Sequence, residues 1–253
     1  MNYFYGINNK IFKSQIQIPV FKNRVLEPSK LQLYKCFPKN NKWIVEEIID
    51  KKINDYFYIL KGDDISSNEI YFLASEEIKN DFDDTKLKNF NNFTDTSPAY
   101  RANFKIYQEN GGFSSYQSEY PFSMVTKKGS ILSSVNSIAN IDANENYILI
   151  RNIFQTPIEE KFKCHIVNIK SRKVEETYEI KSNFTNCIKI NNKFIKPEIF
   201  LITKDFLGVP MYVSVNHKFI SFEHTHPPHE YILSENKFKK ITDLKNEINE
   251  ILN

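Results

Sequence analysis

Short runs of alternating apolar and polar residues recur along most of the chain, separated by clusters of Asn, Asp, Gly, Pro or Lys. Such alternation places apolar side chains on one face of a strand, and this spacing of turn residues is typical of antiparallel hairpins. The clearest pair is "FKCHIVNI" and "VEETYEI", on either side of the charged turn "KSRK". We predict a mainly β protein, an antiparallel sandwich or barrel-like body of many short strands. A small degenerate β-propeller is the alternative.

The end of the chain departs from this alternation. The segment "KITDLKNEINEILN" carries four aliphatic residues at helical spacing with charged residues between them: Ile241, Leu244, Ile248 and Leu252. This pattern predicts an amphipathic helix that packs on the sheet and closes the fold.

Residues 76–98 form the second departure, because they are polar, have no clean period and end at Pro98. They predict an excursion or linker. The expected organisation is therefore a β-rich part at 1–75, this segment, and a main β domain with the closing helix at 99–253. We expect the two β parts to form one continuous body.

Composition supports a β class and argues against a nucleic-acid partner. The chain has 253 residues, enough to bury a core without disulfides or metals. It holds 14 tyrosines and 21 phenylalanines, which favour half-buried pleated surfaces. Lys and Arg total 34 against 31 for Asp and Glu, a formal charge of +3 with both signs mixed along the chain. Nucleic-acid binding would need basic residues clustered on one face.

The cysteines and the length of the apolar runs bear on the cellular compartment in which the protein is found. The three cysteines lie far apart and form no C-x-x-C pair, so they predict neither disulfides nor a thiolate zinc site. No apolar run is long enough to span a membrane, and no signal-peptide pattern opens the sequence. We therefore expect a soluble cytoplasmic protein without membrane contact. The stretch "KKGS" at 127–130 lacks phosphate-loop spacing, so no nucleotide cofactor is indicated.

The densest candidate chemistry is "HTHPPHE", which contains three of the five histidines. If the preceding "FISFE" continues as a strand, His224 and His226 share a face behind an apolar lead-in. The two prolines then rigidify a turn that carries His229 and Glu230. Three nitrogen ligands suit catalytic zinc, whereas two histidines and a carboxylate suit iron or manganese. We predict one divalent metal (Zn, Fe or Mn) held by His224, His226, His229 and Glu230.

Alternatives to a metal centre stay open for this stretch. His229 and Glu230 are candidate catalytic groups, and His224 or His226 suits metal-free acid–base chemistry. The spacing His224-x-His226-x-x-x-Glu230 resembles the first cupin motif over seven residues, without the glycine that opens that motif. The stretch also resembles the metallo-β-lactamase signature, except for Pro228 in place of an aspartate. The histidine-triad hydrolases alternate all three histidines, whereas here the third is offset. We assign the chain to none of these families.

A second polar stretch, "NGGFSSYQSEYP", sets hydrogen-bonding groups among aromatic rings. Such surfaces suit sugars and other polyhydroxylated ligands. If the stretch is extended, Tyr116, Ser118 and Tyr120 share one face, and Gln117 and Glu119 share the other. We predict that Tyr116, Gln117 and Tyr120 bind substrate and that Glu119 is catalytic. The alternative is a polar edge strand with ordinary tyrosine packing.

Two arginines complete the candidate site. Arg101 precedes one predicted strand and Arg151 ends another, and a planar guanidinium there can grip a carboxylate or phosphate. Both are predicted to bind substrate. A partner role for a neighbouring Asp or Glu is the alternative.

These residues lead to two functional hypotheses. The first is an enzyme, metal- or histidine-dependent, that acts on a small polar or sugar-like ligand held between "HTHPPHE" and "FSSYQSEYP". A lyase, isomerase, hydrolase and oxygenase are not distinguished. The second is a non-catalytic carbohydrate- or glycan-binding β protein with structural histidines. A third interpretation is an assembly or interaction protein whose exposed sheet edges pair between subunits, and a homo-oligomer is compatible with the sequence.

Overall fold

The computed structural model describes residues 1–21, 30–76, 78–90, 92–96, 100–109, 111–125, 129–224 and 234–253. Antiparallel sheets dominate it, and one long helix ends the chain. The predicted mainly β class is therefore confirmed. Within these residues no sheet closes into a barrel, and the body is sandwich-like.

Two sheets are built from the first half of the chain. The three-stranded sheet has the order β4 (Lys42–Glu47), β3 (Gln32–Lys39) and β6 (Ile70–Ala74). The four-stranded sheet has the order β5 (Phe57–Lys61), β2 (Lys13–Pro19), β7 (Ala102–Tyr107) and β8 (Phe113–Ser118). In β2, burial follows the alternation of the sequence, since Ile16 and Ile18 are buried and Gln15 and Gln17 are partly exposed. These isoleucines pack against Leu33 and Leu73 of the smaller sheet.

Two further four-stranded sheets form the second half. One has the order β10 (Leu132–Ser134), β15 (Ile199–Thr203), β12 (Lys161–Asn168) and β13 (Lys173–Lys181). The other has the order β14 (Thr185–Ile190), β11 (Glu145–Arg151), β16 (Val209–Asn216) and β17 (Phe219–His224). The hairpin expected at "FKCHIVNI" and "VEETYEI" is β12–β13, which confirms that prediction. Ile150, Ile166 and Leu201 pack between the two sheets.

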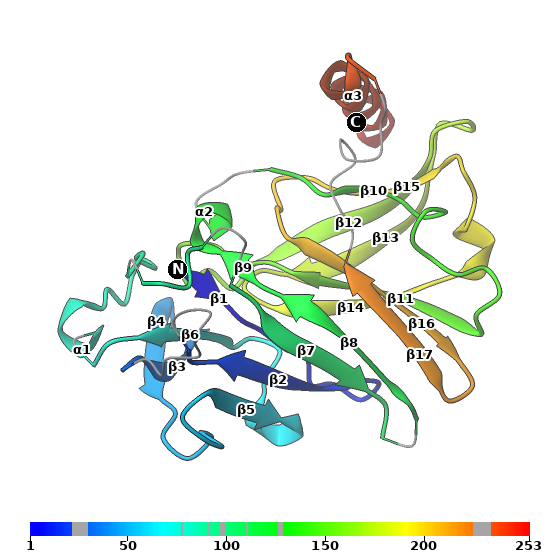
Figure 1. Cartoon of the computed structure of the whole chain (residues 1–253). Coiled ribbons are helices and arrows are strands. Elements are labelled where there is room, and N and C mark those ends of the chain that lie inside the picture. Colours follow the sequence, from blue (N-terminus) through cyan, green and yellow to red (C-terminus); the bar gives the residue numbers. More distant parts are fainter. Residues whose placement is uncertain are drawn as a thin grey trace.

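Strand β11 lies at the centre of the molecule and is covered on both faces. Ile148 and Ile150 face the sheet of β12, whereas Tyr147 and Leu149 belong to the core shared with the N-terminal residues. This double burial explains why "YILI" is an unbroken apolar run rather than an alternating one. In Figure 1 the blue and cyan strands of the first half and the yellow strands of the second half lie on either side of this region.

The remaining elements are short, apart from the closing helix. They are β1 (Asn2–Tyr3), which pairs with β9 (Tyr120–Pro121), the helical turns α1 (Ile78–Asp81) and α2 (Phe122–Val125), and the 3-10 turns Gly62–Asp64 and Asn192–Phe194.

Helix α3 (Lys237–Leu252) confirms the predicted closing helix. Its Ile248 is fully buried against Leu132, Val167 and Ile202 of the β10–β15–β12 sheet. Figure 1 shows it at the end of the molecule beside β10 and β15. No helix among the described residues is both long and apolar enough to cross a membrane.

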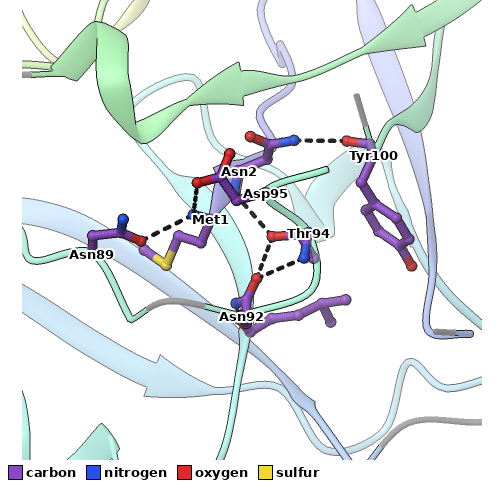
Figure 2. Close-up of polar contacts among 8 residues, drawn as sticks. Met1, Asn2, Asn89, Asn92, Thr94, Asp95 and Tyr100 are labelled. Carbon is purple, nitrogen blue, oxygen red and sulfur yellow. Dashed lines mark hydrogen bonds and ion pairs between the residues drawn. The ribbon is translucent and has the colours of Figure 1, made fainter. Parts of the chain in front are cut away.

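The described part of the polar segment 76–98 packs on the first strand (Figure 2). The α-amino group of Met1 donates to Asn89 Oδ1 at 2.9 Å, and the backbone N–H of Asn2 donates to Thr94 Oγ1 at 3.0 Å. The Asn2 side-chain amide donates to the carbonyl of Tyr100 at 2.9 Å. The polar segment therefore satisfies the backbone N–H of Asn2 in this buried strand, and Tyr100, just beyond the segment, satisfies its side chain.

The buried aromatic residue of β17 gives a test of the core. Phe222 is 4% exposed and makes edge contacts with Phe104 and Tyr116. We expect Phe222→Ala to lower the free energy of unfolding by about 3–5 kcal/mol, through lost burial and the cavity left behind. Chemical denaturation measures the change.

The matched control for this test is Phe219→Ala in the same strand. Phe219 is 78% exposed, so its removal should change stability by no more than about 0.5 kcal/mol. Similar losses from both substitutions would contradict the burial pattern of β17.

Candidate functional site

Strands β8 and β17 come from different sheets and run side by side in the same direction (Figure 1). They meet closely at their starts, where the N–H of Gly112 donates to the carbonyl of Lys218 at 2.5 Å. A Cβ at Gly112 would lie 2.6 Å from that carbonyl oxygen. Glycine is therefore required for this approach.

Aromatic side chains fill the space between these two strands. The ring of Tyr116 stacks on the imidazole of His224, with centroids 5.2 Å apart and planes 13° from parallel. The same ring meets the edge of Phe222 at 4.7 Å. Burial raises the pKa of the Tyr116 hydroxyl well above its ordinary value, so this ring stays neutral. We refer to Tyr116, Phe222 and His224 as the aromatic seam.

A pocket of about 320 Å³ opens at the carboxyl ends of these strands. Its wall is mostly apolar and comes from segments on either side: Met124, Ile131, Leu132, Leu207, Val209 and Pro210. Polar side chains also line the pocket: Arg101, Gln117, Ser118, Glu119, Ser130 and His224. Arg101 and His224 both act electrostatically on the carboxyl of Glu119, so these three lie near one another. We call these three residues the polar end.

An ion pair lies at the polar end. Arg101 Nε is 3.0 Å from Glu119 Oε2, and the exposed fractions of the two side chains are 42% and 18%. Burial raises the pKa of the Glu119 carboxyl above its ordinary value, and Arg101 and His224 oppose part of this rise. The site therefore holds a carboxylate that is more easily protonated than an exposed glutamate.

Glu223 orients the imidazole of His224. Its Oε1 lies 2.7 Å from Nδ1 of His224 and 2.9 Å from the backbone nitrogen of the same residue. Because an ionised carboxylate only accepts hydrogen bonds, Nδ1 carries the proton in this contact. The ring is thus fixed between this hydrogen bond and the stacked Tyr116.

The structure brings five of the predicted site residues together around this pocket: Arg101, Tyr116, Gln117, Glu119 and His224. Two other predicted residues, Tyr120 and Arg151, are fully buried and do not line it. Three more, His226, His229 and Glu230, lie outside the described residues.

Arg151 contacts the core instead of the pocket. Its Nη1 donates to the carbonyl of Ser67 at 2.8 Å, and its guanidinium lies 6.0 Å from the ring centre of Tyr5. Burial lowers the pKa of Arg151 to about 10, which leaves it charged at neutral pH. Its Nε and Nη2 have no hydrogen-bond partner among the described residues.

Tyr120 also belongs to the core. Its hydroxyl accepts from the backbone N–H of Ile153 at 3.4 Å, and its ring packs against the edge of Tyr5.

The apolar wall was not predicted from the sequence. Leu207 lies in the short loop before β16, and Val209 and Pro210 begin that strand. Between them, any Cβ on Gly208 would lie 2.5 Å from the carbonyl of Arg151. Aliphatic residues at strand ends have the same pattern as core residues, so periodicity does not separate the two roles. The glycine between apolar residues was the one available signal of a close backbone approach.

Metal binding remains a prediction from the sequence. Among the described residues, no three His, Cys, Asp or Glu side chains gather in a group that could hold a metal ion. Of the four predicted ligands, only His224 belongs to that part of the chain.

Comparisons of the chain with protein-family models, with curated proteins and with solved structures found no match.

The ion pair at the polar end gives a test of the site's electrostatics. Arg101→Gln should raise the pKa of Glu119 further, because the substitution removes the cation that favours the charged carboxylate. At a given mildly acidic pH, a larger fraction of Glu119 would then be protonated. Carboxyl-carbon NMR titration of protein labelled at glutamate measures the change, with Glu119→Gln used to assign the signal.

The control for this titration is Arg172→Gln. Arg172 pairs with Glu250 on the surface, so its loss should leave the titration of Glu119 unchanged. A Glu119 that titrates like an exposed glutamate in the unmodified protein would contradict the described burial.

Proposed function

We propose that this protein binds a small molecule with an apolar body and a polar head in the pocket, and that Glu119 exchanges a proton with it. The observation that carries the proposal is the convergence of an ion-paired carboxylate and an oriented imidazole in a pocket whose wall is mostly apolar. The volume of about 320 Å³ is in the range of small-molecule sites.

The lining supports a ligand with more apolar surface than a sugar has. A polyhydroxylated ring would place hydroxyl groups against Leu207, Val209 and Ile131, which offer no side-chain hydrogen bonds. Buried hydroxyls without partners would weaken binding. This favours an amphipathic ligand over the sugar-like one expected from the sequence, and it gives less support to glycan binding.

The polar end supports acid–base chemistry on the bound molecule. A carboxyl whose pKa is raised by burial serves as a proton donor more readily than an exposed one. His224 lies at the same end, with the ring nitrogen Nδ1 held by Glu223. These groups suit an enzyme that transfers protons, in which the ion pair with Arg101 positions the carboxylate of Glu119.

A neutral fluorescent dye tests binding. N-phenyl-1-naphthylamine has an apolar body and one polar N–H group, and its emission rises in an apolar environment. We expect it to bind the full chain with a dissociation constant in the micromolar range. Leu207→Asn, which makes the wall polar, should weaken binding by about fivefold or more, in line with the loss of part of one buried leucine contact.

The matched control makes the same kind of change away from the pocket. Ile141 is 63% exposed, so Ile141→Asn should leave dye binding unchanged. Equal binding by both variants would show that the dye binds elsewhere, and absence of binding to the folded chain would overturn the proposal.

A further inference from the structure

The Arg101–Glu119 pair leaves hydrogen-bonding groups of both signs available at the polar end. The single contact joins Arg101 Nε and Glu119 Oε2, so it uses one of the five N–H donors of the guanidinium. The structure gives Arg101 no second carboxylate among the described residues. A ligand can therefore reach donors on one side of the pair and a carboxylate oxygen on the other.

The Arg101–Glu119 pair carries no net charge. These two residues contribute opposite unit charges to the described lining, and Nδ1 of His224 is held at 2.7 Å by Glu223, which lies outside the lining. A ligand with a single net charge would leave one charge unmatched beside an apolar wall, which is costly. A ligand with adjacent negative and positive groups would match the pair, since a guanidinium holds a carboxylate bidentately and a carboxylate accepts from an ammonium.

The wall defines the rest of the ligand. Ile131, Leu207 and Val209 line the same pocket as the pair, and they suit a compact aliphatic or aromatic group. We infer that the ligand is an α-amino acid with an apolar side chain, its carboxylate held by Arg101, its ammonium by Glu119 and its side chain by the apolar wall. This inference rests on the proposed function, because it assigns the polar head and the apolar body of the same ligand.

Four small molecules test separately the contributions of the carboxylate, the ammonium and the side chain to binding. L-leucine carries all three groups, 4-methylpentanoate lacks the ammonium, 3-methylbutan-1-amine lacks the carboxylate, and glycine lacks the side chain. We expect L-leucine to bind the full chain about tenfold or more tightly than each of the other three, because each lacks one charge-assisted contact or the apolar contact. Calorimetry and NMR titration of nitrogen-labelled protein give the affinities and the residues affected.

Two variants assign the contacts in a crossed design. Arg101→Gln should weaken L-leucine about tenfold without weakening the amine, and Glu119→Gln should weaken L-leucine about tenfold without weakening 4-methylpentanoate. Arg172→Gln, which removes a surface arginine paired with Glu250, should change none of these affinities.

The outcomes separate this inference from the proposed function. If the dye binds at Leu207 while L-leucine binds no more tightly than its analogues, the amino-acid inference is wrong and the proposed function stands. If both glutamine variants bind L-leucine as the unmodified protein does, the assigned contacts are wrong. If neither the dye nor L-leucine binds the folded chain, both proposals are overturned.

Discussion

The packing of Tyr116 between Phe222 and His224 is the contact on which the candidate site depends. In the described part of the chain, β8 and β17 belong to separate sheets and share no ladder of backbone hydrogen bonds. Side-chain packing therefore sets their separation beyond the close approach at Gly112. Rings at edge-to-face and stacked distances have preferred geometries, so they fix position as well as excluding water. The polar residues that follow in each strand are held near one another as a result.

At the polar end, the residues that suit ligand binding are not the ones that would stabilise the fold most. Ordering a carboxylate in a partly apolar pocket costs solvation, and the neighbouring guanidinium restores part of it. A hydrophobic pair of similar size would stabilise the fold at least as well, but it would present no donor or acceptor to a ligand. Residues that stabilise the fold less than an alternative would are expected at sites where a protein binds a ligand or catalyses a reaction. The seam and the apolar wall around the pair provide the compensating burial.

Alternation in the sequence was enough to predict the strands and the faces of two of them. It placed His224 with Phe222 in β17 and separated Tyr116 from Gln117 in β8, as the burial patterns show. It did not predict which edge strands are neighbours, because that depends on contacts between residues about a hundred positions apart. Arg151 had the pattern of an exposed strand end, but β11 is covered on both faces and carries its side chain into the core. All four metal ligands, His224 included, stay predictions, as do the cytoplasmic location and the oligomeric state.

The burial of Arg151 has a consequence for the order in which the chain folds. Its guanidinium contacts Ser67, 84 positions earlier in the sequence, and Thr185, 34 positions later. Removing water from this cation before both segments are in place would cost several kcal/mol. The loops between the three residues must therefore close first, and closure over such separations is slow. We expect water to leave this part of the core in one of the last steps of folding, when the two halves of the chain are already together.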